Sequence, residues 1–293
     1  MLRWRLLLGA VLIAALVGLC WFDWHAARPG FVLLPLAVVA ALLAAGELLA
    51  MFRKRGHDPL AWVVYSGVLL TVLAAAAPGL WPALPLGELG WLPCGLVAGL
   101  LLALMGEMRR YDGARHSTVN LSLAVFAVLY VGGLVGFLVA LRLVGGGDGK
   151  LGMFALVSLI AVVKMSDVGQ YTVGRLFGKH KLAPSISPGK TWEGVLGGAV
   201  FACVAAWLMT AWAAQRMLGA PLTAKAPIIQ YALALTAAGI VGDLAESMLK
   251  RDAGVKDSSE WMPGFGGVLD LLDSLLVAAP VGYLFWSMGW ATG

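Results

Sequence analysis

Two apolar runs with a charged segment between them indicate what kind of fold this chain adopts: "PIIQYALALTAAGIVGDLAESMLKRDAGVKDSSEWMPGFGGVLDLLDSLLVAAPVGYLFW", residues 227–286. Each run is about 20 residues long, the length of an α-helix that crosses the hydrocarbon core of a bilayer. The chain of 293 residues is 60% hydrophobic and 13% charged, which excludes an ordinary soluble globular protein. The stretch therefore predicts two membrane spans joined by a polar connection.

The same pattern recurs along the chain, because apolar segments end repeatedly at charged residues, Pro or Gly. They lie at about residues 5–22, 30–52, 60–79, 91–108, 118–145, 150–173, 192–215, 227–249 and 267–290. The predicted fold class is an all-α polytopic membrane protein with about nine transmembrane helices. The fifth segment carries "YVGGLVGF", which predicts either a tilted helix or a helix broken at Gly132–Gly133.

The basic residues predict how the chain is oriented in the membrane. Fifteen of the 21 Lys and Arg residues fall on one side, and four fall on the other: Arg28, Lys150, Arg216 and Lys225. Since cytoplasmic loops carry the excess of basic residues, the N-terminus is predicted in the cytoplasm and the C-terminus outside. The first segment resembles a signal peptide, but no A-x-A site follows it and Leu19 precedes Cys20, so we expect a retained anchor. The expected location is the inner (cytoplasmic) membrane, as a multi-pass protein.

The domain organisation follows from where the charges cluster. Residues 1–150 are expected to form a scaffold of lipid-facing helices. Residues 151–293 are expected to form the catalytic region, with two charged cytoplasmic loops. The three cysteines form no C-x-x-C pair, so neither a disulfide framework nor a thiolate metal site is predicted.

The first charged loop is "SDVGQYTVGRLFGKHKLAPSISPGKTWEG", residues 166–194. Pro188 and Gly189 precede Lys190, and a new helix is predicted from about Thr191. A lysine beside a helix N-terminus favours an anion such as phosphate, although the spacing of a Walker A loop is absent. A purely structural loop is the alternative.

The second charged region has carboxylates on two helix ends. Asp243, Glu246, Ser247 and Lys250 are spaced i, i+3, i+4 and i+7 and share one helix face, and Asp270, Asp273 and Ser274 repeat the first three spacings. Burying four carboxylates in a membrane costs on the order of 10 kcal/mol before pairing. Mg²⁺ would offset this cost, because it prefers hard oxygen ligands. Ion pairing with Lys250, Arg251 and Lys256 is the first alternative, and a position in the wet interface is the second.

Carboxylates that bind a metal, beside clustered Lys and Arg, are what phosphoryl or nucleotidyl transfer requires. No protein nucleophile is needed when one substrate is itself a phosphate. The sequence agrees, because it contains no G-x-S-x-G and no plausible Cys/His or Ser/His pair.

At these residues the chain resembles the phosphatidate cytidylyltransferase (CDP-diacylglycerol synthase) family, whose C-terminal signature contains K-R, K-D, P-G-H-G-G and D-R-apolar-D. The matching residues are Ser247, Lys250, Arg251, Lys256, Asp257, Pro263, Gly264, Gly266, Gly267, Asp270 and Asp273. The upstream "SPGKTWEG" resembles a second conserved region of the family, and Asp167 matches an aspartate before it. Two positions depart from the signature: Phe265 replaces its His, and Leu271 replaces its Arg.

The resemblance implies that CTP and phosphatidate react to give CDP-diacylglycerol and pyrophosphate, with no nucleic acid involved. Asp243 and Asp270 would ligate Mg²⁺, with Glu246 and Asp273 as supporting ligands. The implied catalytic residues are Lys190, Lys250, Arg251, Lys256 and Asp257, and the implied substrate-binding residues are Ser187, Lys190, Asp167 and Ser247. A second cation and a homodimer are left open.

Two other functions fit parts of the pattern. A CTP-dependent lipid kinase of the polyprenol or phytol type would also use CTP at a membrane site, and would release CDP. An ion-coupled transporter would also carry intramembrane carboxylates, although here the charges cluster on one side. Glu47, Glu107 and Lys164 are interpreted as lone charges that snorkel to the interface.

Overall fold

The computed structural model describes residues 2–81, 85–113, 116–222, 225–259, 261 and 266–289. Nearly all regular structure in these ranges is helical, as the sequence predicts. The elements are α1 (Leu2–Trp24), α2 (Leu33–Lys54), α3 (Ala61–Leu80), α4 (Gly87–Arg110), α5 (Ser117–Ala127), η1 (Val128–Gly133), α6 (Leu134–Leu143), α7 (Lys150–Phe177), β1 (Lys181–Ala183), β2 (Ser187–Thr191), α8 (Trp192–Leu208), η2 (Met209–Ala213), α9 (Ala214–Met217), α10 (Lys225–Asp252) and α11 (Val268–Ser287).

The helices confirm the prediction of a polytopic membrane protein. Within the described residues, eight helical stretches are long and apolar enough to cross a membrane, and Gly9–Trp24 is a shorter apolar one. Of the two alternatives for the fifth segment, the helix broken at Gly132–Gly133 is wrong. These two residues belong to the π-helical segment η1, which joins α5 to α6 in one continuous stretch of 27 residues, Ser117–Leu143. A π-helical turn changes the direction of the side chains without ending the backbone hydrogen bonding.

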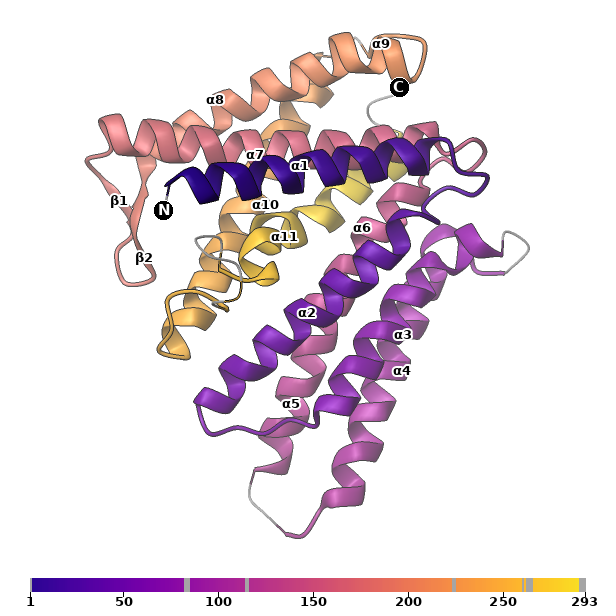
Figure 1. The fold of residues 1–293 in the computed structure, drawn as a ribbon, viewed down its shortest axis with the longest axis vertical. Helices are drawn as coiled ribbons and strands as arrows, with labels where there is room; N and C mark the ends of the chain where they lie inside the picture. The colour runs from indigo at the N-terminus through magenta and orange to yellow at the C-terminus, as the bar shows by residue number, and fades with distance from the viewer. Residues whose placement is uncertain are drawn as a thin grey trace.

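The helices form two packed groups that share α11. In Figure 1, α2 to α6 lie together on one side, whereas α7, α8 and α10 lie on the other and α1 runs along α7. One buried cluster joins α7, α8, α10 and α11, and the other joins α2, α3 and η1 to Leu269 and Leu276 of α11. The helix α11 is therefore held from both sides.

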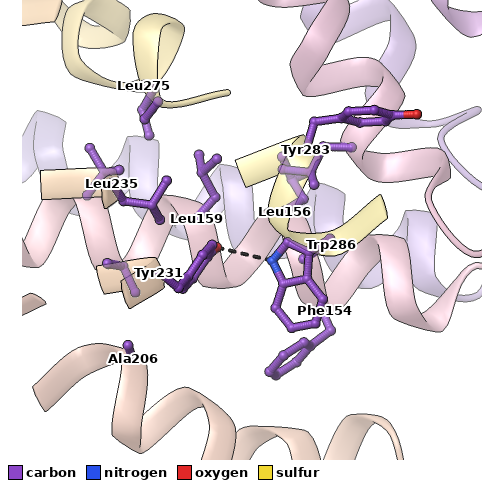
Figure 2. Packing of buried hydrophobic residues seen from close by; sticks show 14 of the residues in the cluster. Phe154, Leu156, Leu159, Ala206, Tyr231, Leu235, Leu275, Tyr283 and Trp286 are labelled. Carbon is purple, nitrogen blue, oxygen red and sulfur yellow. Dashed lines mark hydrogen bonds between the residues drawn. The ribbon is translucent and has the colours of Figure 1, made fainter. Parts of the chain in front are cut away.

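Aromatic residues hold α10 and α11 against α7 in the first cluster. Figure 2 shows Tyr231, Trp286 and Phe154 in contact, with the Trp286 indole N–H donating to the Tyr231 hydroxyl at 3.2 Å. The rings of Phe154 and Trp286 meet edge to face, with their centroids 5.4 Å apart. Such pairs are favourable beyond the area that they bury, so they fix the relative position of these helices.

A buried ion pair joins the first helix to the rest of the molecule. Arg142 Nε donates to Asp23 Oδ2 at 2.7 Å, and the same carboxylate accepts backbone N–H groups at the start of α2, from Gly30, Val32 and Leu33. These hydrogen bonds and the ion pair offset the free-energy cost of removing the Asp23 carboxylate from water. The pair therefore anchors α1 and α6 to the start of α2.

The loop predicted before α8 is a β-hairpin. Strands β1 and β2 are antiparallel, and "SPGKT" forms β2. The helix start predicted at about Thr191 is confirmed, because the Thr191 hydroxyl accepts the backbone N–H of Gly194 at 3.1 Å as the N-cap of α8. The hairpin thus delivers Lys190 to the first turn of α8.

Candidate active site

A polar cavity of about 650 Å³ lies between the hairpin and the helices α7, α8, α10 and α11. Its lining residues are Lys164, Asp167, Gln170, Tyr171, Gly174, Arg175, Ser187, Gly189, Lys190, Thr191, Gly194, Asp243, Asp270 and Asp273. Four of them are aspartates and three are basic. The cavity therefore brings together the two charged regions, residues 166–194 and 243–274, which lie about 50 residues apart in the sequence.

Close packing of α10 on α11 lets their carboxylates share this cavity. A Cβ atom at Gly242 would collide with the backbone carbonyl of Asp273, so only glycine permits this approach. The next residue is Asp243, which lines the cavity together with Asp273. The local "GD" sequence thus places one carboxylate from each helix on the same wall.

The hairpin is tied to α10 by an ion pair. Lys190 Nζ lies 2.7 Å from Asp243 Oδ2, and the Ser247 hydroxyl donates to Asp243 Oδ1 at 3.3 Å. The Lys190 side chain is only 15% exposed, so this pair is largely shielded from water. Low local polarity strengthens such a pair, and it would equally strengthen the binding of a phosphate to Lys190.

A second lysine joins α10 to α11. Lys250 Nζ lies 2.6 Å from Glu246 Oε2 and 2.5 Å from Asp270 Oδ1. The Glu246 side chain is fully buried, which places it behind the cavity wall. The predicted stripe of Asp243, Glu246, Ser247 and Lys250 does share one face, because Ser247 contacts Asp243 and Lys250 contacts Glu246.

Asp270 also organises the start of α11. Its Oδ2 accepts the backbone N–H of Gly267 at 2.8 Å, the backbone N–H of Ser258 at 2.8 Å and the hydroxyl of Ser258 at 2.6 Å. These bonds form an N-terminal cap and also hold the preceding loop. Both oxygens of Asp270 therefore have partners.

Glu47 of α2 caps the same helix end from the other half of the molecule. Its carboxylate accepts backbone N–H groups from Val268 at 2.9 Å and Leu269 at 2.8 Å, and it also bonds the Ser258 hydroxyl and the Trp261 indole. The residue is 8% exposed. The prediction that Glu47 snorkels to the interface is therefore wrong, because a negative charge at a helix N-terminus is favourable inside the protein.

Lys164 and Glu107 also differ from the snorkelling prediction. Lys164 lines the cavity and donates to Asp167 Oδ2, the Leu271 carbonyl and the Ser274 hydroxyl at 3.4, 3.2 and 3.1 Å. The Glu107 side chain is 7% exposed and pairs with Arg110 at 3.0 Å. Both charges find protein partners, so neither needs to reach water.

The predicted site residues fall into three groups. Those that line the cavity are Asp167, Ser187, Lys190, Asp243, Asp270 and Asp273. Those directly behind it are Glu246, Ser247 and Lys250. Arg251 donates to the Ile186 carbonyl at 3.4 Å at the hairpin, and Lys256 and Asp257 are exposed and are not lining residues. Pro263, Gly264 and Phe265 lie outside the described residues.

Some lining residues were missed from the sequence. Lys164, Gln170, Tyr171 and Arg175 all lie on α7 with Asp167, and the Arg175 guanidinium bonds the Tyr171 hydroxyl at 2.7 Å. Together with Asp167 they are spaced i, i+3, i+6, i+7 and i+11 from Lys164, and this recurrence of polar residues along one side of a helix was the available signal. It was missed because apolar residues surround them in the sequence.

The donor chemistry of the cavity fits a hard divalent cation. Carboxylates from α7, α10 and α11 line it, and oxygen donors of this kind suit Mg²⁺. Among the described residues, no three acidic, His or Cys side chains converge on one point. Asp243 and Asp270 instead contact lysines, whereas Asp273 has no Lys or Arg partner within ion-pair distance among those residues. Of the predicted ion-pairing alternative, Lys250 is confirmed as the partner of Glu246 and Asp270, whereas Asp243 pairs with Lys190, and Arg251 and Lys256 form no ion pair among the described residues.

Comparison with known proteins agrees with nucleotidyl transfer, the reaction class that the sequence indicates. The cytidylyltransferase family matches residues 4–288. The phosphatidate cytidylyltransferase of Brucella suis is 35% identical over 268 residues, which cover 90% of this chain and 87% of that protein. That of Pseudomonas aeruginosa is 33% identical over 276 residues, which cover 88% of this chain and 95% of that protein. That of Haemophilus influenzae is 46% identical over 129 residues, 44% of each chain.

Proposed function

This chain belongs to the cytidylyltransferase family, and we propose that it transfers the cytidylyl group of CTP to phosphatidate. The products are CDP-diacylglycerol and pyrophosphate. The observation that carries this proposal is the cavity, where four aspartates and three basic residues meet beside the ends of membrane-spanning helices. Such a site suits two phosphate-bearing substrates, one from water and one from the bilayer.

The reaction requires no nucleophile from the protein. An oxygen of the phosphatidate phosphate forms a bond to the α-phosphorus of CTP, and the bond from that phosphorus to the bridging oxygen of the β-phosphate breaks in line. Pyrophosphate leaves with the electron pair of the broken bond. The residues around the cavity position both phosphates and stabilise the charge that develops, which is the main contribution of proteins to this chemistry.

Mg²⁺ would be held by Asp243, Asp270 and Asp273, with Glu246 behind them. When bound, it would draw negative charge from the phosphates of CTP. Asp273 is the carboxylate that is ready for this role, because no lysine pairs with it among the described residues. Asp243 would exchange its lysine for the cation.

The lysines would then hold phosphate oxygens. Lys190, which pairs with Asp243 in this structure, would be free to bind phosphate if Asp243 held the cation, and it lies beside the N-terminus of α8, where an anion is also favoured. Lys250 keeps α10 and α11 together through Glu246 and Asp270. Ser187, Ser247 and Arg251 would contact substrate from the side of the cavity near the hairpin. Asp167 would contact it from the side formed by α7. Lys256 and Asp257 would act from the exposed loop, by turning toward bound nucleotide.

The cavity would open to the cytoplasm of the cell, in the inner membrane. The excess of basic residues around the hairpin and the loop after α10 supports this orientation, with the N-terminus inside and the C-terminus outside. Residues 1–150 would act as the scaffold and residues 151–293 as the catalytic region.

A product assay tests this function. The purified protein in detergent receives CTP, phosphatidate and Mg²⁺, and mass spectrometry scores the lipid product while a coupled assay scores pyrophosphate. We expect equal amounts of CDP-diacylglycerol and pyrophosphate, with both lost when EDTA removes Mg²⁺. CDP together with a newly phosphorylated lipid alcohol would support the kinase alternative and contradict the proposal.

A further inference from the structure

Lys164 is a cation in the cavity that the family signature does not include. It lies thirteen residues before Phe177, the end of α7, which corresponds to about 20 Å along the helix axis. Its side chain is 41% exposed, and it lines the cavity. A charged residue within a membrane span is costly, and it usually marks a path for a substrate or an ion.

The contacts of Lys164 are looser than those of the other lysines. Its only carboxylate partner, among the described residues, is Asp167 at 3.4 Å, whereas Lys190 and Lys250 lie 2.5 to 2.7 Å from theirs. Asp167 does not depend on this lysine, because the Ser274 hydroxyl donates to the same oxygen at 3.0 Å. An anion that enters the cavity can therefore bind Lys164 without first breaking a short ion pair.

Lys164 lies beside the position on α11 where the family signature has a positive charge and this chain has none. The family signature has an arginine between its two aspartates, and here that residue is Leu271. Lys164 Nζ donates to the backbone carbonyl of Leu271 at 3.2 Å and to the Ser274 hydroxyl at 3.1 Å. The neighbouring helix α7 thus brings a positive charge to the turn of α11 that lies between Asp270 and Ser274.

The depth of Lys164 indicates which substrate it meets. The other basic lining residues are Arg175 and Lys190. Arg175 lies on the same helix, eleven residues nearer its end, or about 16 Å along the axis. With the hairpin on the cytoplasmic side, as proposed above, a nucleotide from water would reach Arg175 and Lys190 first, whereas Lys164 lies further along α7 into the span, where the phosphate of a lipid would enter from the membrane.

We propose that Lys164 binds the phosphate of the lipid substrate and supplies the positive charge that Leu271 lacks. This inference rests on the proposed function, because the lipid is the acceptor of the cytidylyl group. Lys164 takes no part in bond making, and its ammonium group stays protonated throughout. Its phosphate contacts would replace the long contact to Asp167.

Steady-state kinetics test this role with both substrates varied in turn. For Lys164→Met, we expect kcat/KM for phosphatidate to fall about tenfold to hundredfold, as for the loss of a charged hydrogen bond. The KM for CTP should change less than about threefold, and Lys164→Arg should keep most of the activity. Lys54→Met, at the exposed end of α2, is the matched control and should resemble wild type. A Lys164→Met variant with wild-type kcat/KM for phosphatidate would overturn the proposal.

A double variant tests the link to position 271. In Lys164→Met combined with Leu271→Arg, the returned charge should restore at least part of the activity lost in Lys164→Met. A double variant that unfolds at the wild-type temperature and yet regains nothing would contradict the proposed replacement of charge.

Binding separates failure of this role from failure of the proposed function. Short-chain phosphatidate and the matching diacylglycerol are titrated into wild type and Lys164→Met, without CTP. We expect wild type to prefer phosphatidate, and the variant to lose that preference. If wild type binds phosphatidate in this way but forms no CDP-lipid, the proposed function fails and the phosphate site stands. An equal preference in both proteins would overturn the role of Lys164.

Discussion

At the scale of single residues, the aspartates of this cavity differ in what they do for the fold. Asp270 bonds Lys250, Ser258 and Gly267, so it holds the loop before α11 as well as facing the cavity. Within the described part of the chain, Asp273 accepts one hydrogen bond, at 2.5 Å from the backbone N–H of Ser274 that follows it. Loss of charge at the two positions should therefore have different consequences.

Asp270→Asn should lower both stability and activity, whereas Asp273→Asn should lower activity alone. Asp270 loses charged bonds to buried partners, which costs about 1–3 kcal/mol. Asp273→Asn removes the proposed cation ligand without removing a contact to another element of the fold. Thermal unfolding in detergent and the rate of CDP-diacylglycerol formation measure the two effects. A large loss of stability in Asp273→Asn with Asp270→Asn unaffected would reverse this assignment.

The sequence was informative about residues whose partners are near in the chain. The i, i+3 and i+4 spacings placed Asp243, Ser247 and Lys250 on one face, because the period of a helix is known in advance. Glu47 and Lys164 were misjudged, because all partners of Glu47 in the described residues, and all of those of Lys164 except Asp167, lie 107 to 222 residues away, and no local pattern indicates them. The match to a family signature could not help with residues outside that signature.

At the scale of elements, the start of α11 depends on a side chain from α2. Glu47 accepts the N–H groups of Val268 and Leu269, and Asp270 accepts that of Gly267. The space is tight, because a Cβ atom at Gly267 would collide with both the Glu47 carboxylate and the Ser258 hydroxyl. Two carboxylates thus cover the N-terminus of the helix that carries Asp270 and Asp273.

Glu47→Ala should destabilise the protein and reduce its activity, although Glu47 does not line the cavity. The buried N–H of Leu269 and the partly buried N–H of Val268 lose their acceptor, which costs about 1–3 kcal/mol for a buried group. Glu47→Gln should fall between wild type and Glu47→Ala, because one amide oxygen can still accept. The unfolding temperature and the KM and kcat for both substrates provide the measurements.

The matched control for Glu47 is Asp58→Asn, at an exposed surface pair. It should unfold at the same temperature as wild type, since exposed ion pairs contribute little. If Glu47→Ala also unfolds at the wild-type temperature and keeps full activity, the capping role of Glu47 is contradicted.

The hairpin was the element that the sequence did not reveal. "SPGKT" contains Pro and Gly, which favour a loop, and strand β2 has only five residues. The pairing of Lys181 with Thr191 supplies the order that local propensity lacks. The helix boundary after it was predicted correctly, because a threonine N-cap is a local feature.

At the scale of the whole molecule, hydropathy was sufficient for the number and type of the helices. The length of an apolar segment can be read directly from the sequence. All nine predicted segments are helical stretches in the described ranges. How the helices pack does not follow from hydropathy, because lipid and protein neighbours are equally apolar. The position of α11 between the two groups of helices can be seen near the centre of Figure 1. Its membership in both buried clusters needed the structure.

This arrangement changes how the two halves of the chain are understood. The proposed scaffold of residues 1–150 and the proposed catalytic region of residues 151–293 meet at α11, through Leu269, Leu276 and the carboxylate of Glu47. The N-terminal helices therefore do more than face lipid, since they fix the helix that carries two of the four cavity aspartates.

The fate of the α-phosphate of CTP tests the central claim most directly. Two reactions are run with the full chain, phosphatidate and Mg²⁺, one with CTP labelled at the α-phosphate and one with CTP labelled at the γ-phosphate. The account predicts that the α-label appears in the lipid and the γ-label in pyrophosphate. A γ-label in the lipid with the α-label in released CDP would contradict it.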